Sequence, residues 1–187
     1  MLLKNSDGIG ISSISDWEYP ELEKIAQEAN RKNKLFAIHG SEAVREDIDS
    51  ILDLHPDLLV HMIKATKEDL IRVQENDIPV VLCPRSNAFF GLKIDYHLMN
   101  QCGLTLLLGT DNAMLQSPDI LEELCYLKSK TTEFSLLELL HMITYTPRKV
   151  LNEDADILVP NSSSAFVVLD QETLKPIYIS SDKRGKP

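Results

Sequence analysis

Three stretches decide the fold: Phe36-Ala-Ile-His39, Leu58-Leu-Val-His61 and Leu106-Leu-Leu-Gly-Thr-Asp111. Each is a short apolar run that ends in a His or Asp, and an amphipathic segment follows it. Continuous apolar strands alternating with helices indicate a parallel sheet that is covered on both faces. In a barrel built from such units, the carboxyl ends of the strands meet at one face, where the chemistry takes place. A shared site formed by these three polar side chains is therefore predicted.

The same alternation extends along most of the chain. Apolar runs after the first one begin at about residues 35, 58, 78 and 104, with predicted helices between them. This repeat favours parallel strands joined by right-handed helical crossovers. The predicted strands are 8–13, 35–38, 58–60, 78–82 and 104–108, and the predicted helices are 20–32, 44–54, 66–76, 95–101, 117–128 and 135–145.

These elements predict an α/β fold, a partial (β/α)8 barrel followed by a β-hairpin. Only about five βα units can be counted, whereas a complete barrel needs roughly 250 residues. Residues 1–157 are assigned to the partial barrel, and 83–93 to a loop within it. Residues 158–180 are assigned to a C-terminal hairpin, formed by 165–169 and 176–180, and residues 181–187 to a polar tail.

The bulk composition excludes several functional classes. The 187 residues carry a net charge of −10, which argues against general binding to nucleic acid or to an anionic membrane. No apolar run approaches the ~20 residues that span a bilayer, and the first residues lack the apolar region of a signal peptide. Three widely spaced cysteines fit reduced thiols in a cytoplasmic protein better than a disulfide framework.

Each candidate site residue also has a simpler structural interpretation. A single His at a strand end is more often a hydrogen-bonded structural residue, and this applies to His39 and His61 when each is taken alone. Glu42 fits a charge at a helix N-terminus, and Asp111 fits an Asx-turn or a helix cap. The repetition of polar residues at equivalent positions favours a metal centre, with a carboxylate nearby to move protons.

The segment Cys83-Pro-Arg-Ser-Asn87 follows another predicted strand. Arg85, Ser86 and Asn87 could orient a polar substrate, or they could be ordinary loop residues, and the sequence leaves both open. The zinc nucleobase deaminases carry a PCxxC signature, but Ser86 stands where its second cysteine would be. That family is therefore excluded.

Together these segments resemble the amidohydrolase superfamily, specifically its branch of cytosine deaminases, chlorohydrolases and S-adenosylhomocysteine/methylthioadenosine deaminases. The matching pieces, in the family's order, are Ile38-His-Gly-Ser-Glu42, Val60-His61, Cys83-Pro-Arg-Ser-Asn87, Gly109-Thr-Asp-Asn112 and Thr146-Pro-Arg-Lys-Val-Leu151. The resemblance implies that the chain contains about strands four to eight of the barrel. It also implies that the hairpin belongs to a small β-sandwich built from both chain ends.

The resemblance implies a role for each residue of the site. His39 would be a metal ligand, Glu42 the proton shuttle, and His61 the residue that polarises the substrate or orients the water. Asp111 would be both ligand and base. One divalent zinc or iron ion would lower the pKa of its water to near ~7, for attack on an amide or amidine carbon of a small heterocyclic substrate.

The chain also departs from the family pattern. No His-x-His pair is present, so two metal ligands of the first strand are missing, and the fourth-strand candidate has no bridging lysine. This favours a mononuclear site and predicts weak or absent activity for the chain alone. Met1 is expected to begin just before the fourth strand, through a fragment, a truncated gene or a misassigned start.

Two further hypotheses remain open. The chain could be a non-catalytic half-barrel that assembles with itself as a homo-oligomer or with a missing N-terminal half, because a half-barrel leaves sheet edges uncovered. Alternatively, the histidines of a metal-independent fragment could bind substrate directly.

Overall fold

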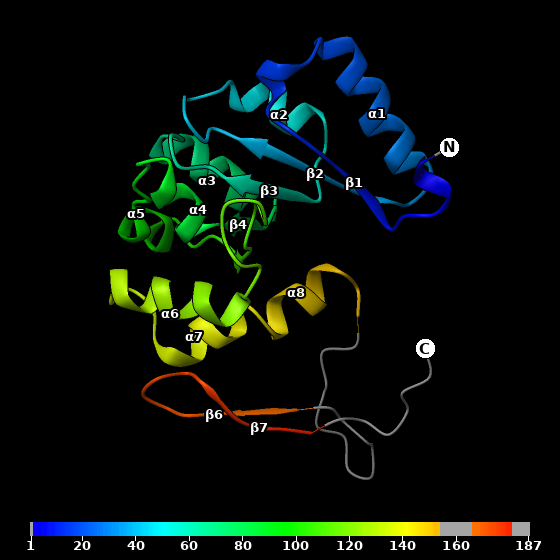
Figure 1. The fold of residues 1–187 in the computed structure, drawn as a ribbon. Helices are drawn as coiled ribbons and strands as arrows, with labels where there is room; N and C mark the ends of the chain where they lie inside the picture. Colours follow the sequence, from blue (N-terminus) through cyan, green and yellow to red (C-terminus); the bar gives the residue numbers. More distant parts are fainter. Residues whose placement is uncertain (1, 154–165, 181–187) are drawn as a thin grey trace.

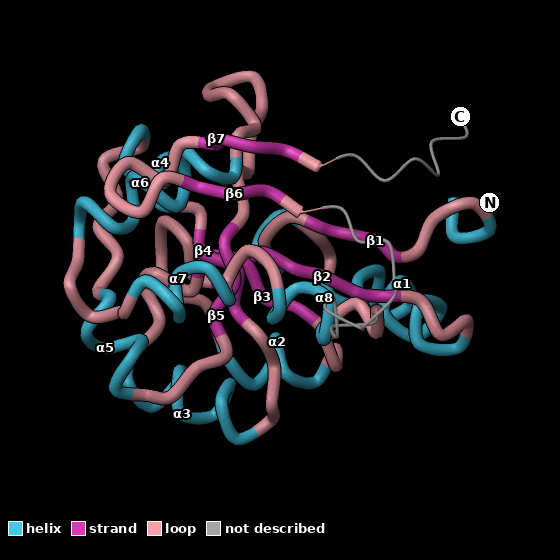
Figure 2. The backbone as a smooth tube through the Cα atoms, turned by 90° about the horizontal axis from the view of Figure 1, so that it is seen from below, coloured by secondary structure: helices cyan, strands magenta, loops and turns pink. Residues whose placement is uncertain are grey.

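The computed structural model describes residues 2–153 and 166–180. Five parallel strands form one sheet in the order β1-β2-β3-β4-β5, and two antiparallel strands, β6 and β7, form a separate hairpin. The strands are β1 (Gly8–Ile11), β2 (Leu35–Gly40), β3 (Leu58–His61), β4 (Val80–Leu82), β5 (Leu106–Leu108), β6 (Val167–Leu169) and β7 (Pro176–Ile179). Figure 1 labels β1 to β4 and the C-terminal hairpin, and Figure 2 also labels β5.

Helices connect successive strands of the parallel sheet and flank it. The α-helices are α1 (Tyr19–Arg31), α2 (Ile48–Asp53), α3 (Lys67–Glu75), α4 (Pro84–Phe89), α5 (Tyr96–Gln101), α6 (Ile120–Lys130), α7 (Leu136–His141) and α8 (Tyr145–Val150). Two short 3-10 helices, η1 (Leu2–Lys4) and η2 (Ile14–Asp16), precede α1. The tube view in Figure 2 shows α1, α2, α3 and α5 along one side of the strands β1 to β5.

Strand order follows chain order because each βα unit places the next strand beside the last one. The core lies between the sheet and its helices, and Phe36, Leu59 and Leu82 from successive strands are fully buried. All three residues of β5 are buried, as expected for a strand covered on both faces. The sequence-based fold class, a partial (β/α)8 barrel with a C-terminal hairpin, is confirmed.

Local chemistry sets several helix boundaries. At α3, Thr66 accepts a hydrogen bond from the backbone N–H of Asp69, whose carboxylate accepts one from the Thr66 N–H. This reciprocal capping box satisfies two backbone donors that a helix start would otherwise leave unpaired. Ser135 and Glu138 form the same arrangement at α7.

Four predictions of helix position or extent were wrong. The segment 83–93, predicted as a loop, contains α4, which begins at Pro84, a residue type that suits the first helical position. Helix α2 begins at Ile48 rather than at residue 44, because Asp47 caps it. Helix α6 is capped by Asp119 rather than by Ser117. The predicted helix 135–145 divides into α7 and α8, since Thr144 has a non-helical backbone.

The hairpin packs beside α6 through two contacts with the turn between its strands. Cys125 Sγ lies 3.5 Å from the carbonyl oxygen of Thr173, and Lys128 Nζ donates to the carbonyl of Glu172 at 3.2 Å. The predicted domain boundary at residues 157 and 158 and the predicted polar tail lie outside the described residues. Within the described ranges, none of the helices is long and apolar enough to cross a membrane.

Candidate active site

The three strand-end residues come together in space. His39 lies in β2, His61 is the last residue of β3, and Asp111 follows β5. One potential ligand atom from each of them lies within 4.8 Å of the other two. The two imidazole rings are 4.8 Å apart between centroids and nearly perpendicular, at 79°. We call His39, His61 and Asp111 the His-His-Asp group.

The backbone turns sharply at this edge of the sheet. Ser41, His61 and Asp111 all adopt the left-handed region, with φ values of 46°, 75° and 55°. Such angles are uncommon for residues other than glycine and occur often at functional sites. Gly40 packs closely here, since a Cβ at this position would lie 2.9 Å from Met62 Sδ and would push that side chain aside.

Glu42 and Asn87 lie beside the His-His-Asp group. The amide nitrogen of Asn87 donates to Glu42 Oε1 at 3.2 Å and lies 3.1 Å from Nδ1 of His61. Glu42 Oε1 is also 3.5 Å from Nε2 of His61. Partial burial raises the pKa of Glu42, and the nearby Asp111 carboxylate adds to this, against a lowering contribution from His39. A carboxyl group with a raised pKa is suited to proton transfer.

His61 is held as a neutral imidazole. Burial lowers its pKa to about 4, and the neighbouring His39 contributes in the same direction. Its Nε2 atom and Asn87 Oδ1 are the two buried side-chain polar atoms without a hydrogen-bond partner among the described residues. A buried polar atom without a hydrogen-bond partner in the protein points to a further group, such as a water or a substrate, at this place.

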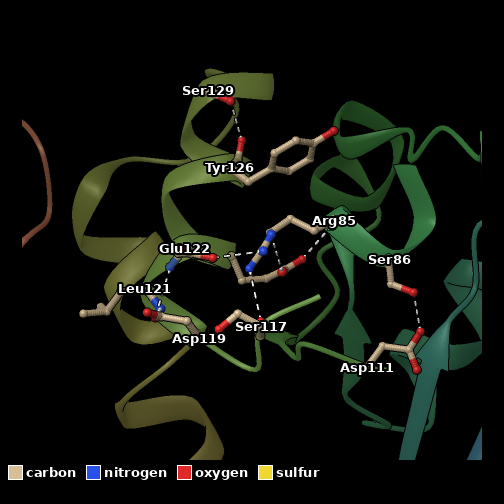
Figure 3. Close-up of polar contacts among 10 residues, drawn as sticks. Arg85, Ser86, Asp111, Ser117, Asp119, Leu121, Glu122, Tyr126 and Ser129 are labelled. Carbon is tan, nitrogen blue, oxygen red and sulfur yellow. Dashed lines mark hydrogen bonds and ion pairs between the residues drawn. The ribbon is translucent and has the colours of Figure 1, made fainter. Parts of the chain in front are cut away.

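The side chains of Ser86 and Arg85, both in the first turn of α4, point in different directions, as Figure 3 shows. The Ser86 hydroxyl donates to Oδ2 of Asp111. The Arg85 guanidinium instead turns to α6, where Nη2 lies 2.9 Å from Glu122 Oε2 and Nε lies 3.8 Å from Glu123 Oε2. The structure therefore brings Ser86 and Asn87 to the His-His-Asp group and directs Arg85 away from it.

Glu123 was not singled out from the sequence. Its carboxylate is buried and accepts the Arg85 backbone N–H at 2.7 Å, so it caps the first turn of α4. Burial raises the pKa of Glu123, while the hydrogen bond from the Arg85 backbone and the positive charge of the Arg85 guanidinium oppose this rise. Within α6 this residue is one of two adjacent glutamates, so no local pattern distinguishes it.

A family model described as the amidohydrolase family matches residues 3–186, and the chain belongs to this family. A protein of Archaeoglobus fulgidus, whose name assigns it provisionally to the aminohydrolases, is 40% identical over 119 residues. That match covers 63% of this chain and 36% of the relative.

Solved structures share the fold. An aminofutalosine deaminase from Helicobacter pylori superposes with a TM-score of 0.68 at 19% identity, over 81% of this chain and 49% of that one. A zinc-bound adenosine deaminase from Xanthomonas campestris superposes with a TM-score of 0.65 at 16% identity, over 78% of this chain and 38% of that one. The chain therefore spans half or less of the length of these three proteins.

Proposed function

We propose that the chain supplies part of the active site of a metal-dependent amidohydrolase that deaminates a small nitrogen heterocycle. The observation that carries the proposal is the His-His-Asp group, with ligand atoms within 4.8 Å, at the carboxyl edge of a parallel sheet. Family membership supports hydrolase chemistry, and the named deaminases of the same fold support a heterocyclic amine or amidine as the substrate class.

The residues fit a divalent zinc or iron ion. The His39 imidazole and the Asp111 carboxylate are donors that both metals accept. With the Asn87 amide donating to Nδ1 of His61, Nε2 carries the ring hydrogen and faces Glu42 at 3.5 Å, so His39 and Asp111 would hold the metal and His61 lies beside them. When bound, such a metal supplies Lewis-acid activation of water and of the substrate.

The chain's own residues then handle the protons. Glu42, with its raised pKa, is suited to carry a proton between water and the substrate's ring nitrogen or leaving amine. Asp111 acts as ligand and as acceptor of a proton from water, and the Ser86 hydroxyl fixes one of its oxygens. His61 orients the water or polarises the substrate while its ring remains neutral near pH 7.

The contacts of the α4 residues favour positioning roles. Ser86 and Asn87 are buried against Asp111, Glu42 and His61, and Arg85 is paired with acidic groups of α6. The substrate contacts assigned to Arg85, Ser86 and Asn87 from sequence stay a prediction. We infer that these residues act mainly by holding the catalytic side chains in place.

Metal binding is the first test. The full chain is stripped with EDTA, dialysed and titrated with Zn²⁺ by calorimetry, beside His39→Ala and Asp111→Asn. The matched control is His97→Ala, because the exposed His97 ring pairs with Glu133 at 3.1 Å and lies outside the His-His-Asp group. We expect His39→Ala and Asp111→Asn to weaken Zn²⁺ binding at least about 10-fold, since each removes a direct ligand. Equal binding by all four proteins would contradict the proposed metal site.

Ammonia release from a panel of amino- and amidine-bearing heterocycles is the second test. Weak or absent turnover is expected for this chain alone, because a catalytic zinc commonly has about three protein ligands and this chain supplies two, His39 and Asp111. Robust turnover that survives His39→Ala would contradict the assignment of His39.

An assembly role is supported by a separate observation. Strands β1 and β5 each pair with only one neighbour among the described strands, so the sheet has two edges at which a further strand could pair. Light scattering coupled to size-exclusion chromatography tests whether the chain covers these edges by self-association. A stable monomer at high concentration would argue against it.

A further inference from the structure

Glu46 is a buried carboxylate outside the His-His-Asp group. It lies between β2 and α2, and only 8% of its surface is exposed. No Lys, Arg or His forms an ion pair with it in the part of the chain that the structure describes. A buried carboxylate without a cation must be satisfied by hydrogen bonds.

Its two oxygens bind two different loops. Oε1 accepts hydrogen bonds from the Ser13 hydroxyl, from the Ser15 backbone N–H at 3.1 Å and from the Ser15 hydroxyl at 2.9 Å. Oε2 accepts the Ser41 backbone N–H at 2.8 Å. Ser13 and Ser15 follow β1, and Ser41 follows β2, so one side chain ties together the carboxyl ends of two adjacent strands.

The Glu46 carboxylate stabilises the backbone conformation of Ser41. Ser41 is 1% exposed and holds a left-handed backbone with φ of 46°, a conformation that L-residues disfavour. Its hydroxyl accepts the Glu46 backbone N–H at 3.0 Å, and its carbonyl accepts the Lys64 N–H at 2.7 Å. With the Oε2 contact, every polar group of Ser41 is engaged, which stabilises the unusual backbone.

The position of Ser41 in the chain connects this contact to the site. His39 lies two residues before Ser41, and Glu42 comes directly after it. A change in the Ser41 backbone angles would redirect the Glu42 side chain away from His61 and Asn87. Its effect on His39 would be smaller, because that residue is held in β2 by pairing with β3.

We propose that Glu46 is a positioning residue of the candidate active site, which fixes the Ser41 turn and through it the Glu42 carboxylate. The inference rests on the proposed function for its catalytic consequence, whereas the contact between Glu46 and Ser41 can be tested independently. The proposal predicts that both Glu46 carboxylate oxygens must be hydrogen-bond acceptors, because each of them faces hydrogen-bond donors.

Glu46→Gln is therefore a sharp test despite its similar shape. One glutamine oxygen can satisfy either the Ser13 and Ser15 side or the Ser41 N–H, and the NH₂ group then faces a donor on the other side. Ser15→Ala, which removes one donor to Oε1, is the milder variant. The matched control is Glu138→Gln, because Glu138 also accepts a serine N–H and hydroxyl, at 2.7 and 2.6 Å from Ser135, but lies in the capping box of α7.

Amide hydrogen exchange by NMR, on the metal-free full chain, measures the contact itself. In Glu46→Gln we expect the exchange rate of the Ser41 or Ser15 amide to rise at least about 10-fold. This rise is counted beyond any change in the exchange rate of Ile38, a residue of the core strand β2. Ser15→Ala should show a smaller effect at the same amides, and Glu138→Gln none. A general loss of stability would instead accelerate all three amides together. Unchanged protection at both Ser41 and Ser15 in Glu46→Gln would overturn the inference.

Catalytic consequence needs a second readout. In whatever form of the protein shows turnover, Glu46→Gln should lower kcat with little change in KM and with Zn²⁺ affinity changed less than about 3-fold, because Glu42 is displaced while His39 is not. An unchanged kcat, despite faster Ser41 exchange, would overturn the positioning role. If the wild-type chain fails to bind Zn²⁺, the proposed function fails, whereas the exchange data still decide whether Glu46 holds the Ser41 turn.

Discussion

Replacing Asn87 with alanine tests how the side chains of the candidate active site are held. Asn87 is fully buried, and its amide group contacts Glu42 Oε1 at 3.2 Å and His61 Nδ1 at 3.1 Å. Alanine removes both contacts and creates a small polar cavity. It leaves a buried imidazole nitrogen without a donor, while Glu42 remains partly solvated, with 30% of its side chain exposed.

The size of the effect follows from these two contacts. A hydrogen bond to a charged group contributes about 1.5–3 kcal/mol, and a buried neutral group left without a partner costs about 1–3 kcal/mol. The Glu42 contact belongs at the low end of its range, because water can replace the lost donor. We therefore expect Asn87→Ala to lower the free energy of unfolding by about 2–3 kcal/mol.

Urea unfolding followed by circular dichroism measures this free energy on the metal-free protein. Asn100→Ala is the control, because the exposed Asn100 amide makes one long contact, at 3.3 Å, to the Glu133 carbonyl. It should change the free energy by less than about 0.5 kcal/mol. ¹⁵N NMR of the His61 ring supplies a local readout: with Asn87 donating to Nδ1, the neutral ring carries its hydrogen on Nε2, and Asn87→Ala should weaken that preference.

Two results would refute the reasoning. A loss below about 0.5 kcal/mol in Asn87→Ala would mean that the two contacts do not stabilise the folded state. A wild-type His61 ring protonated on Nδ1 would mean that the Asn87 amide presents its oxygen to the imidazole.

Gly109→Ala should lower the free energy of unfolding in urea by about 1–3 kcal/mol, because the new Cβ would lie 2.8 Å from Val81 Cγ1. The control is Gly10→Ala, whose Cβ would meet nothing within 4 Å. It should lower the free energy of unfolding by less than about 1 kcal/mol. Asp69 pairs with Arg45 at 2.8 Å, and this hydrogen bond is the main cause that lowers the Asp69 pKa below its usual 3.8. The unfolded chain therefore binds a proton at this group more readily than the folded chain, so its stabilising contribution is present at neutral pH and disappears as pH falls below about 4. Because the Arg45 side chain is 53% exposed, Asp69→Asn should lower the free energy of unfolding by only about 1 kcal/mol at pH 7. The urea midpoints of wild type and variant should converge near pH 2. A difference between the two midpoints that stays constant from pH 7 to pH 2 would contradict this assignment.

Hydrophobic runs predicted most of the architecture. All five parallel strands lie where the apolar runs place them, because a buried strand needs an uninterrupted apolar sequence on both faces. Helix α4 was missed because its six residues contain no apolar repeat. It forms because Pro84 suits a helix start and the Glu123 carboxylate, distant in sequence, accepts the Arg85 N–H.

The candidate site was predictable only in part. His39, His61 and Asp111 could be singled out because each ends an apolar run, and the structure brings them within 4.8 Å. Their assigned roles stay predictions. The direction of Arg85 could not be predicted, because a local sequence does not show that Glu122 and Glu123 lie beside it.

By itself, the sequence determined the alternation of strands and helices and the polar residues that end the strands, because both depend on local hydrophobic pattern. Only the tertiary structure decided which groups meet: Asn87 with Glu42 and His61, Ser86 with Asp111, and Glu46 with the loops after β1 and β2. These contacts join residues far apart in the chain, or on successive loops whose directions depend on packing. A buried polar group must find its partner in space, and no short-range sequence pattern specifies that partner.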